Sequence, residues 1–92
     1  MAYFYLSFAG DEGWRGCVHV AADSFIEAVD KSHRLGINPG GEVMGFEIPE
    51  GALGDPMWKK VEANCFDRLM TREQMAELFG PDEMIRMPEE LM

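Results

Sequence analysis

Apolar and polar residues alternate along the first part of the chain as in two β-strands joined by a tight turn. Residues 2–9 (AYFYLSFA) carry large apolar groups in both alternating sets of positions, which is typical of a strand covered on both faces and central in a sheet. Residues 10–13 (GDEG) combine two glycines with two acids and mark a turn. Residues 15–22 (RGCVHVAA) resume a β-rich pattern, so the two segments are expected to form a hairpin.

A helix and a third strand are expected next. Ser24 and Glu27 have the spacing at which each side chain caps the backbone amide of the other. Gly36 ends this helix, because glycine tolerates the left-handed conformation that follows a last helical turn. Residues 38–41 (NPGG) are a turn signal, and residues 42–48 (EVMGFEI) alternate like a strand. The face that this helix turns to the sheet is expected to carry Phe25, Ala28, Val29 and Ser32.

The order of these elements predicts the topology of the sheet. A helix between the second and third strands returns the chain by a right-handed crossover, so that these two strands lie parallel. The first strand is central and is therefore placed between them, antiparallel to both. The sequence predicts an α+β fold with a three-stranded antiparallel sheet, connected ββαβ in the spatial order 2-1-3, with one crossover helix and C-terminal helices.

The C-terminal helices have recognisable capping residues. Residues 49–54 (PEGALG) form a linker, and Asp55 is the N-cap of a helix with proline in its first position. Thr71 and Gln74 repeat the capping-box spacing and start another helix, which ends at Gly80. One face of the first of these helices is expected to carry Trp58, Val61, Cys65 and Leu69. We assign residues 1–81 to a single α+β domain and residues 82–92 to an acidic, methionine-rich C-terminal tail.

Composition and charge restrict the function. The 92 residues suffice for one domain, and 47% hydrophobic with 27% charged residues is a globular composition. The net charge of -9, from 17 acids and 8 bases, argues against a protein that holds nucleic-acid phosphates. The sequence has no apolar run of membrane-spanning length and no charged-then-apolar leader. We therefore expect a cytoplasmic protein with reduced cysteines and no membrane contact.

Two cysteines and two histidines are the candidates for metal binding and for catalysis. Cys17 and His19 lie on one side of a strand, and Cys65 and His33 could approach them to complete four zinc ligands. Structural zinc sites usually have two close-spaced ligand pairs, and only one is present. A cysteine nucleophile would also need an orienting group that the sequence does not reveal. We expect no metal, no cofactor, no catalytic residue and no enzymatic activity.

The segment 36–43 (GINPGGEV) is the most specific string in the chain. It resembles a segment of small uncharacterised proteins in phage, prophage and bacterial sequences, and the resemblance implies a phage-type accessory protein without implying any chemistry. Gly40 and Gly41 could form a small nest of backbone amides for an anion, with Asn38, His33 and Arg34 beside it. The alternative is a tight helix-to-strand connection that needs positive φ.

The hairpin turn is the second candidate site. Trp14 lies between Gly13 and Gly16 and next to Arg15, and a large aromatic beside a cation is typical of an interface anchor. We expect these two residues at an accessible hairpin tip, with the acidic pair Asp11 and Glu12, as a partner-binding site. The alternative is that the tryptophan folds back onto the sheet edge.

Two functions remain open. The first is a non-enzymatic, acidic phage-type accessory or counter-defence protein that inhibits or sequesters a host protein through an acidic surface with a few apolar anchors. The alternative is a small-molecule sponge that captures a nucleotide-like anionic ligand at residues 38–41. A homodimer is also expected, because the crossover helix covers one face of the sheet and the C-terminal helices must either cover the other or exchange with a neighbour.

Overall fold

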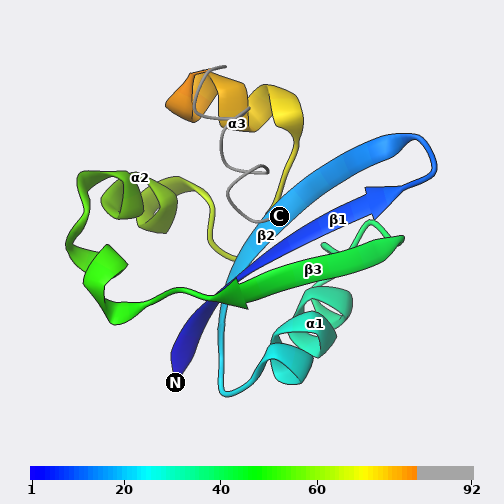
Figure 1. Cartoon of the computed structure of the whole chain (residues 1–92). Helices are drawn as coiled ribbons and strands as arrows, with labels where there is room; N and C mark the ends of the chain where they lie inside the picture. Colours follow the sequence, from blue (N-terminus) through cyan, green and yellow to red (C-terminus); the bar gives the residue numbers. More distant parts are fainter. Residues whose placement is uncertain (81–92) are drawn as a thin grey trace.

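Four antiparallel strands form one sheet in the order β3-β1-β2-β4 in the computed structural model, which describes residues 1–80 (Figure 1). The α+β class, the central first strand and the order 2-1-3 are confirmed, and a fourth strand extends the sheet beyond β2. The predicted tail at residues 82–92 lies outside the described residues. In chain order the elements are β1 (Ala2–Gly10), β2 (Gly13–Ala22), α1 (Phe25–Arg34), β3 (Glu42–Glu47), the 3-10 helix η1 (Glu50–Gly54), α2 (Pro56–Asn64), β4 (Leu69–Met70) and α3 (Arg72–Phe79).

The crossover helix α1 covers one face of the sheet, as its sequence predicts. The Ser24 hydroxyl accepts a hydrogen bond from the backbone N–H of Glu27 at 3.2 Å and caps the helix. Ala28 and Ser32 are fully buried against the sheet, and Gly36 follows the helix with a φ of 72°. The buried side chains of this first face are Phe4, Leu6, Phe8, Val18, Val20, Ala22 and Ala28.

The helix α2 is shorter than the sequence pattern predicts. It begins as expected, because Asp55 Oδ1 accepts the backbone N–H of Met57 at 2.8 Å. It ends at Asn64, however, and the chain then turns through Asp67, which has a φ of 56°. Leu69 is therefore part of β4, where it pairs with Val18, instead of lying on the helix. Two residues are too few for alternation to reveal a strand, which is why this edge of the sheet was missed.

The linker predicted at residues 49–54 contains the single-turn helix η1 at Glu50–Gly54. Helix α3 begins with the predicted capping box, in which Thr71 and Gln74 each bond the backbone amide of the other at 3.3 Å and 2.8 Å. Gly80 caps its C-terminal end.

The second face of the sheet is covered by α2 and α3 of the same chain (Figure 1). Its buried residues are Tyr5, Cys17, Trp58, Val61, Cys65, Met70 and Met75. The C-terminal helices therefore fold back and cover the second face within one chain. Exchange with a second copy is not needed to cover it. The dimer remains a prediction that sedimentation equilibrium measures. Within residues 1–80 no helix is long and apolar enough to cross a membrane.

Candidate functional site

Four aromatic rings form a row across the second face of the sheet, perpendicular to the strands. Phe46 on β3 lies opposite Tyr5 on β1, and Tyr5 lies opposite His19 on β2. Phe66 bridges to His19 from the loop after α2. Successive ring centroids are 5.5 Å, 5.2 Å and 6.3 Å apart, within or close to the range of favourable aromatic contacts. Trp58 of α2 stacks edge-on against Phe66 at 5.6 Å, so the helix is anchored on one end of the row.

A pocket of about 330 Å³ lies between this row and α2. Its lining includes the rings of Tyr5, His19 and Phe46, and the carboxylate residue among the lining residues is Asp55. The remaining lining side chains are Ile48, Pro49, Ala52, Met57, Trp58 and Val61. The volume and the apolar lining are those of a small ligand site or of a cavity that accepts one large side chain.

The titratable groups of this face are held in their neutral forms. His19 is 3% exposed, its Nδ1 has no hydrogen-bond partner among the described residues, and burial lowers its pKa to about 4. Burial raises the pKa of the Cys17 thiol to about 12 and that of the Cys65 thiol to about 11. Burial also raises the pKa of Tyr5. At neutral pH this cluster supplies no thiolate and no imidazolium.

The four residues considered as zinc ligands do not come together. Cys17, His19 and Cys65 belong to the second face, whereas His33 is exposed on α1. In the part of the chain that the structure describes, no three His, Cys, Asp or Glu side chains are grouped as a metal site.

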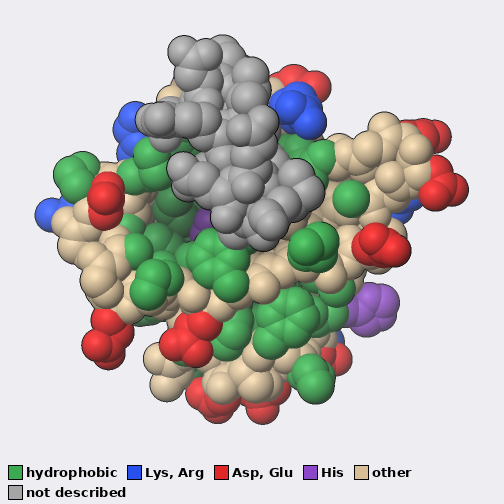
Figure 2. Space-filling view, in the orientation of Figure 1, with side chains coloured by type: hydrophobic (Ala, Val, Ile, Leu, Met, Phe, Trp, Pro, Cys, Tyr) green, Lys and Arg blue, Asp and Glu red, His purple; other side chains and the backbone are tan. Residues whose placement is uncertain are grey.

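Strand β3 is an edge strand with large apolar side chains in solvent. Met44 is 58% exposed and Phe46 is 38% exposed. Both belong to the α2 face of the sheet, opposite Ser7 and Tyr5 of β1. The acids Glu42 and Glu47, at the two ends of the strand, are also exposed. Figure 2 shows hydrophobic side chains gathered over β3 and toward α2, with acidic side chains around them.

We call Glu42, Met44, Phe46 and Glu47 the β3 surface. Sequence reasoning identified the strand and missed the surface. How much of the second face is covered depends on where the C-terminal segments pack. The alternation of residues 42–48 predicts a strand but does not show which of its side chains stay exposed. The usable signal was the acid at each end of an otherwise apolar strand, which is a common feature of exposed edges.

The hairpin places its predicted partner-binding residues in two different settings. Asp11, Glu12 and Arg15 are exposed. Trp14 is half-buried, because it folds back onto the second face and its Nε1–H donates to Ser7 Oγ at 2.7 Å. The expectation of a freely accessible tryptophan at the tip is therefore wrong: the tip itself is Asp11-Glu12, and partner binding there stays a prediction.

The reason for this geometry is a bulge in the hairpin. Phe8 pairs with Gly16 and Ala9 with Trp14, so Arg15 has no partner on β1. The Arg72 guanidinium of α3 also lies over the Trp14 ring, with Cζ 5.7 Å from the ring centroid. The tryptophan therefore connects the hairpin to α3.

The glycine loop lies beside Arg15. Arg15 Nη1 donates to the carbonyl of Pro39 at 3.0 Å. The Gly40 N–H already donates to Asn38 Oδ1 at 2.7 Å, so this amide is not free for an anion. Gly41 has a φ of 90°, and a Cβ there would collide with the carbonyl of Ala9. These contacts favour the structural role of the loop, and ligand capture by it stays a prediction.

The two helix residues expected near this loop, His33 and Arg34, are arranged differently from each other. Arg34 is paired with Asp30 one helical turn earlier, at 2.9 Å. His33 and Asn38 line a shallow hollow of about 430 Å³ on the outer side of α1, which also includes Ile26.

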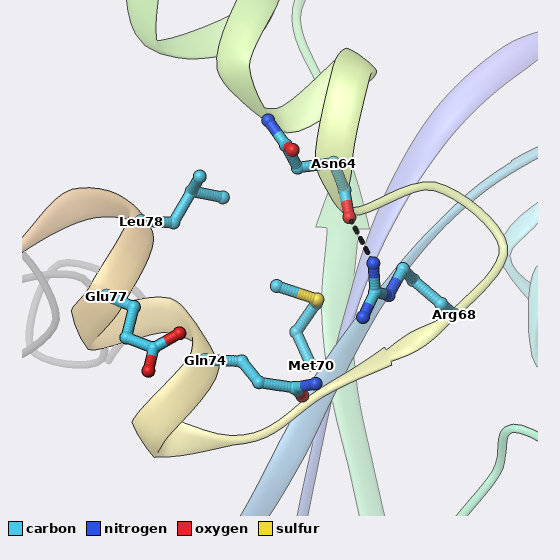
Figure 3. A pocket seen from close by; sticks show the side chains of 6 residues that line it. All are labelled: Asn64, Arg68, Met70, Gln74, Glu77 and Leu78. Carbon is cyan, nitrogen blue, oxygen red and sulfur yellow. Dashed lines mark hydrogen bonds between the residues drawn. The ribbon is translucent and has the colours of Figure 1, made fainter.

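A second, polar pocket lies between the end of α2, β4 and α3 (Figure 3). Arg68, Met70 and Gln74 point toward one another there, and Arg68 Nη1 donates to the carbonyl of Asn64 at 3.4 Å. Glu77 also lines this pocket. The pocket contains one basic residue, Arg68, and one acidic residue, Glu77, so its charge favours neither an anionic nor a cationic ligand. It is therefore a weaker candidate than the β3 surface.

Comparison with protein-family models, with curated proteins and with solved structures finds no match for this chain.

Proposed function

We propose that this chain is a non-enzymatic, acidic protein-binding module that acts as a phage-type accessory or counter-defence protein. In this proposal the β3 surface contacts a host protein with a basic surface and sequesters or inhibits it. The observation that carries the proposal is the pair of exposed apolar side chains, Met44 and Phe46, between two acids on an edge strand.

Two physical arguments support this assignment. Large apolar side chains that remain in solvent on a folded domain are typical of contact sites, because burying them against a partner is favourable. The net charge of -9 accelerates association with basic surfaces and disfavours acidic ones. A host protein with a basic groove that normally holds nucleic acid would match both the apolar side chains and the negative charge.

The test is a comparison of three proteins as affinity baits in lysate of the native host. These are the wild type, a Met44→Lys/Phe46→Lys double variant, and an Ile26→Lys control. Ile26 is a suitable control because it is an apolar residue, 80% exposed, on α1. We expect a partner that the wild type and the control retain and that the double variant loses, followed by one-to-one binding of the purified partner that weakens with salt.

Equal recovery of every captured protein by all three baits would contradict the proposal. Circular dichroism and urea unfolding of the double variant provide the folding control, because Phe46 also packs against Tyr5 and its replacement is expected to cost about 1 to 2 kcal/mol.

A further inference from the structure

We infer that the partner binds as an extended, basic segment that adds a fifth strand to the free edge of β3. The inference rests on the proposed function and specifies its partner class and binding mode. In strand addition, backbone hydrogen bonds supply affinity, and side-chain pockets beside the edge supply specificity.

The backbone of β3 has hydrogen-bonding groups available for such a strand. The Ile48 N–H donates to the Tyr3 carbonyl at 2.7 Å, which fixes the phase of the ladder between β1 and β3. Because bonded and non-bonded pairs alternate in an antiparallel ladder, the N–H and C=O groups of Val43, Gly45 and Glu47 point away from β1. Among residues 1–80 no strand pairs with this outer side.

The side chains of the edge indicate the composition of the added strand. Met44 and Phe46 are exposed on the face that also carries the aromatic pocket, and Phe46 itself lines that pocket. A residue directly opposite Phe46 would lie about 5 Å from it, so an apolar side chain there reaches the pocket rim. Glu42 and Glu47 at the two ends favour lysine or arginine at the matching positions.

A second copy of the chain fits this edge less well than a basic segment. Antiparallel pairing of the outward groups of two β3 edges can place Gly45 opposite Gly45 and Val43 opposite Glu47 of the second copy, but β3 has no lysine or arginine to offer to Glu42 or Glu47. The overall charge of -9 on each copy opposes the contact further.

The experiment uses twelve-residue peptides selected from a random library against the full chain. We expect them to carry lysine or arginine around an alternating apolar core. Bound peptide should slow hydrogen exchange at the amides of Val43, Gly45 and Glu47 at least tenfold. N-methylation of alternate peptide amides should weaken binding at least tenfold, because it removes the backbone hydrogen bonds.

A matched pair of variants isolates one backbone hydrogen bond. Glu47→Pro and Glu47→Thr both remove the carboxylate, but only proline removes the outward N–H, and an outward position on an edge strand tolerates proline. We expect Glu47→Pro to weaken peptide binding about tenfold more than Glu47→Thr. Equal loss in the two variants would contradict strand addition.

The remaining outcomes separate this inference from the proposed function. Selected peptides that leave the three amides unprotected, or that bind equally well when N-methylated, overturn strand addition. If the Met44→Lys/Phe46→Lys bait still loses its host partner in that case, the proposed function stands. A doubled mass in sedimentation equilibrium, with the same amides protected without peptide, assigns the edge to a second copy and overturns the inference.

Discussion

The two faces of the sheet are closed in different ways. The first face is covered by α1, one regular helix, and its core is made of apolar side chains together with Ser32. The second face is covered by three short elements, η1, α2 and α3, and it contains His19, Cys17 and Cys65. The first face leaves no large apolar strand residue exposed, whereas the second leaves Met44 and Phe46 in solvent.

Under the proposed function, this difference separates the residues that stabilise the fold from those that bind a partner. The regular helix α1 covers the apolar strand residues of the first face, although its own Ile26 remains 80% exposed. A face closed by short segments keeps a pocket and a free strand edge, which is the setting in which other chains can pair. We therefore expect substitutions on the first face to affect mainly folding, and those on the β3 surface to affect mainly binding.

The largest expected effect is a difference in stability between substitutions of two phenylalanines, one on the first face and one on the β3 surface. Phe8 is fully buried on the first face, so Phe8→Ala should lower the free energy of unfolding by about 3 to 5 kcal/mol. Phe46 is 38% exposed, so Phe46→Ala should cost only about 1 to 2 kcal/mol while weakening partner binding.

Urea unfolding followed by tryptophan fluorescence measures both values. If Phe8→Ala does not fold, Phe8→Leu provides an intermediate substitution. Similar stability losses at Phe8 and Phe46 would show that the β3 surface is part of the core.

The second expected effect is a pH dependence that arises only from the second face. Burial lowers the pKa of His19 from 6.5, its ordinary value in an unfolded chain, to about 4 in the folded chain. Between these values the unfolded chain binds a proton that the folded chain does not. The free energy of unfolding should therefore fall by about 3 kcal/mol as the pH is lowered from 6.5 to 4, and His19 should contribute no slope above this window.

His19→Phe should remove this contribution, and His33→Gln should not, because His33 is exposed on α1. The measurement is the difference in pH slope between each variant and the wild type, which cancels the carboxylates common to all three proteins. An NMR titration of the wild-type His19 ring reads the pKa directly. A value near 6.5 would show that the ring is hydrated.

Local sequence signals predicted the first face well. The Ser24 cap, Gly36 and the helical spacing of Ala28 and Ser32 all lie within one segment, so α1 and its packing face could be assigned from the sequence. The central position of β1 also followed, because both of its alternating sets are apolar.

The second face depended on contacts that no local pattern encodes. Strand β4 has two residues, and the turn before it relies on Asp67 at positive φ, which asparagine or glycine would have signalled more clearly. The exposure of Met44 and Phe46 depends on where α2 and η1 end. The position of Trp14 depends on a bulge at Arg15 and on Arg72, which lies far along the chain.

The smallest expected effect tests how α3 is attached to the second face. Arg72 lies over the half-buried ring of Trp14, which also bonds Ser7. Arg72→Gln should cost about 0.5 to 1 kcal/mol, because it removes a cation–π contact at a partly exposed site and keeps a helix-forming residue.

Trp14→Ala should cost more, about 2 kcal/mol, because it also loses the buried part of the ring. Amide exchange in α3 should be faster in both variants, while exchange in α1 stays unchanged. Two outcomes would contradict this attachment: equal effects of Arg72→Gln on the exchange of α1 and α3, or a Trp14→Ala variant that keeps full stability and loses partner binding. The second outcome would make Trp14 a binding anchor instead of a structural link between the hairpin and α3, because the ring would then be stabilising a complex and not the fold.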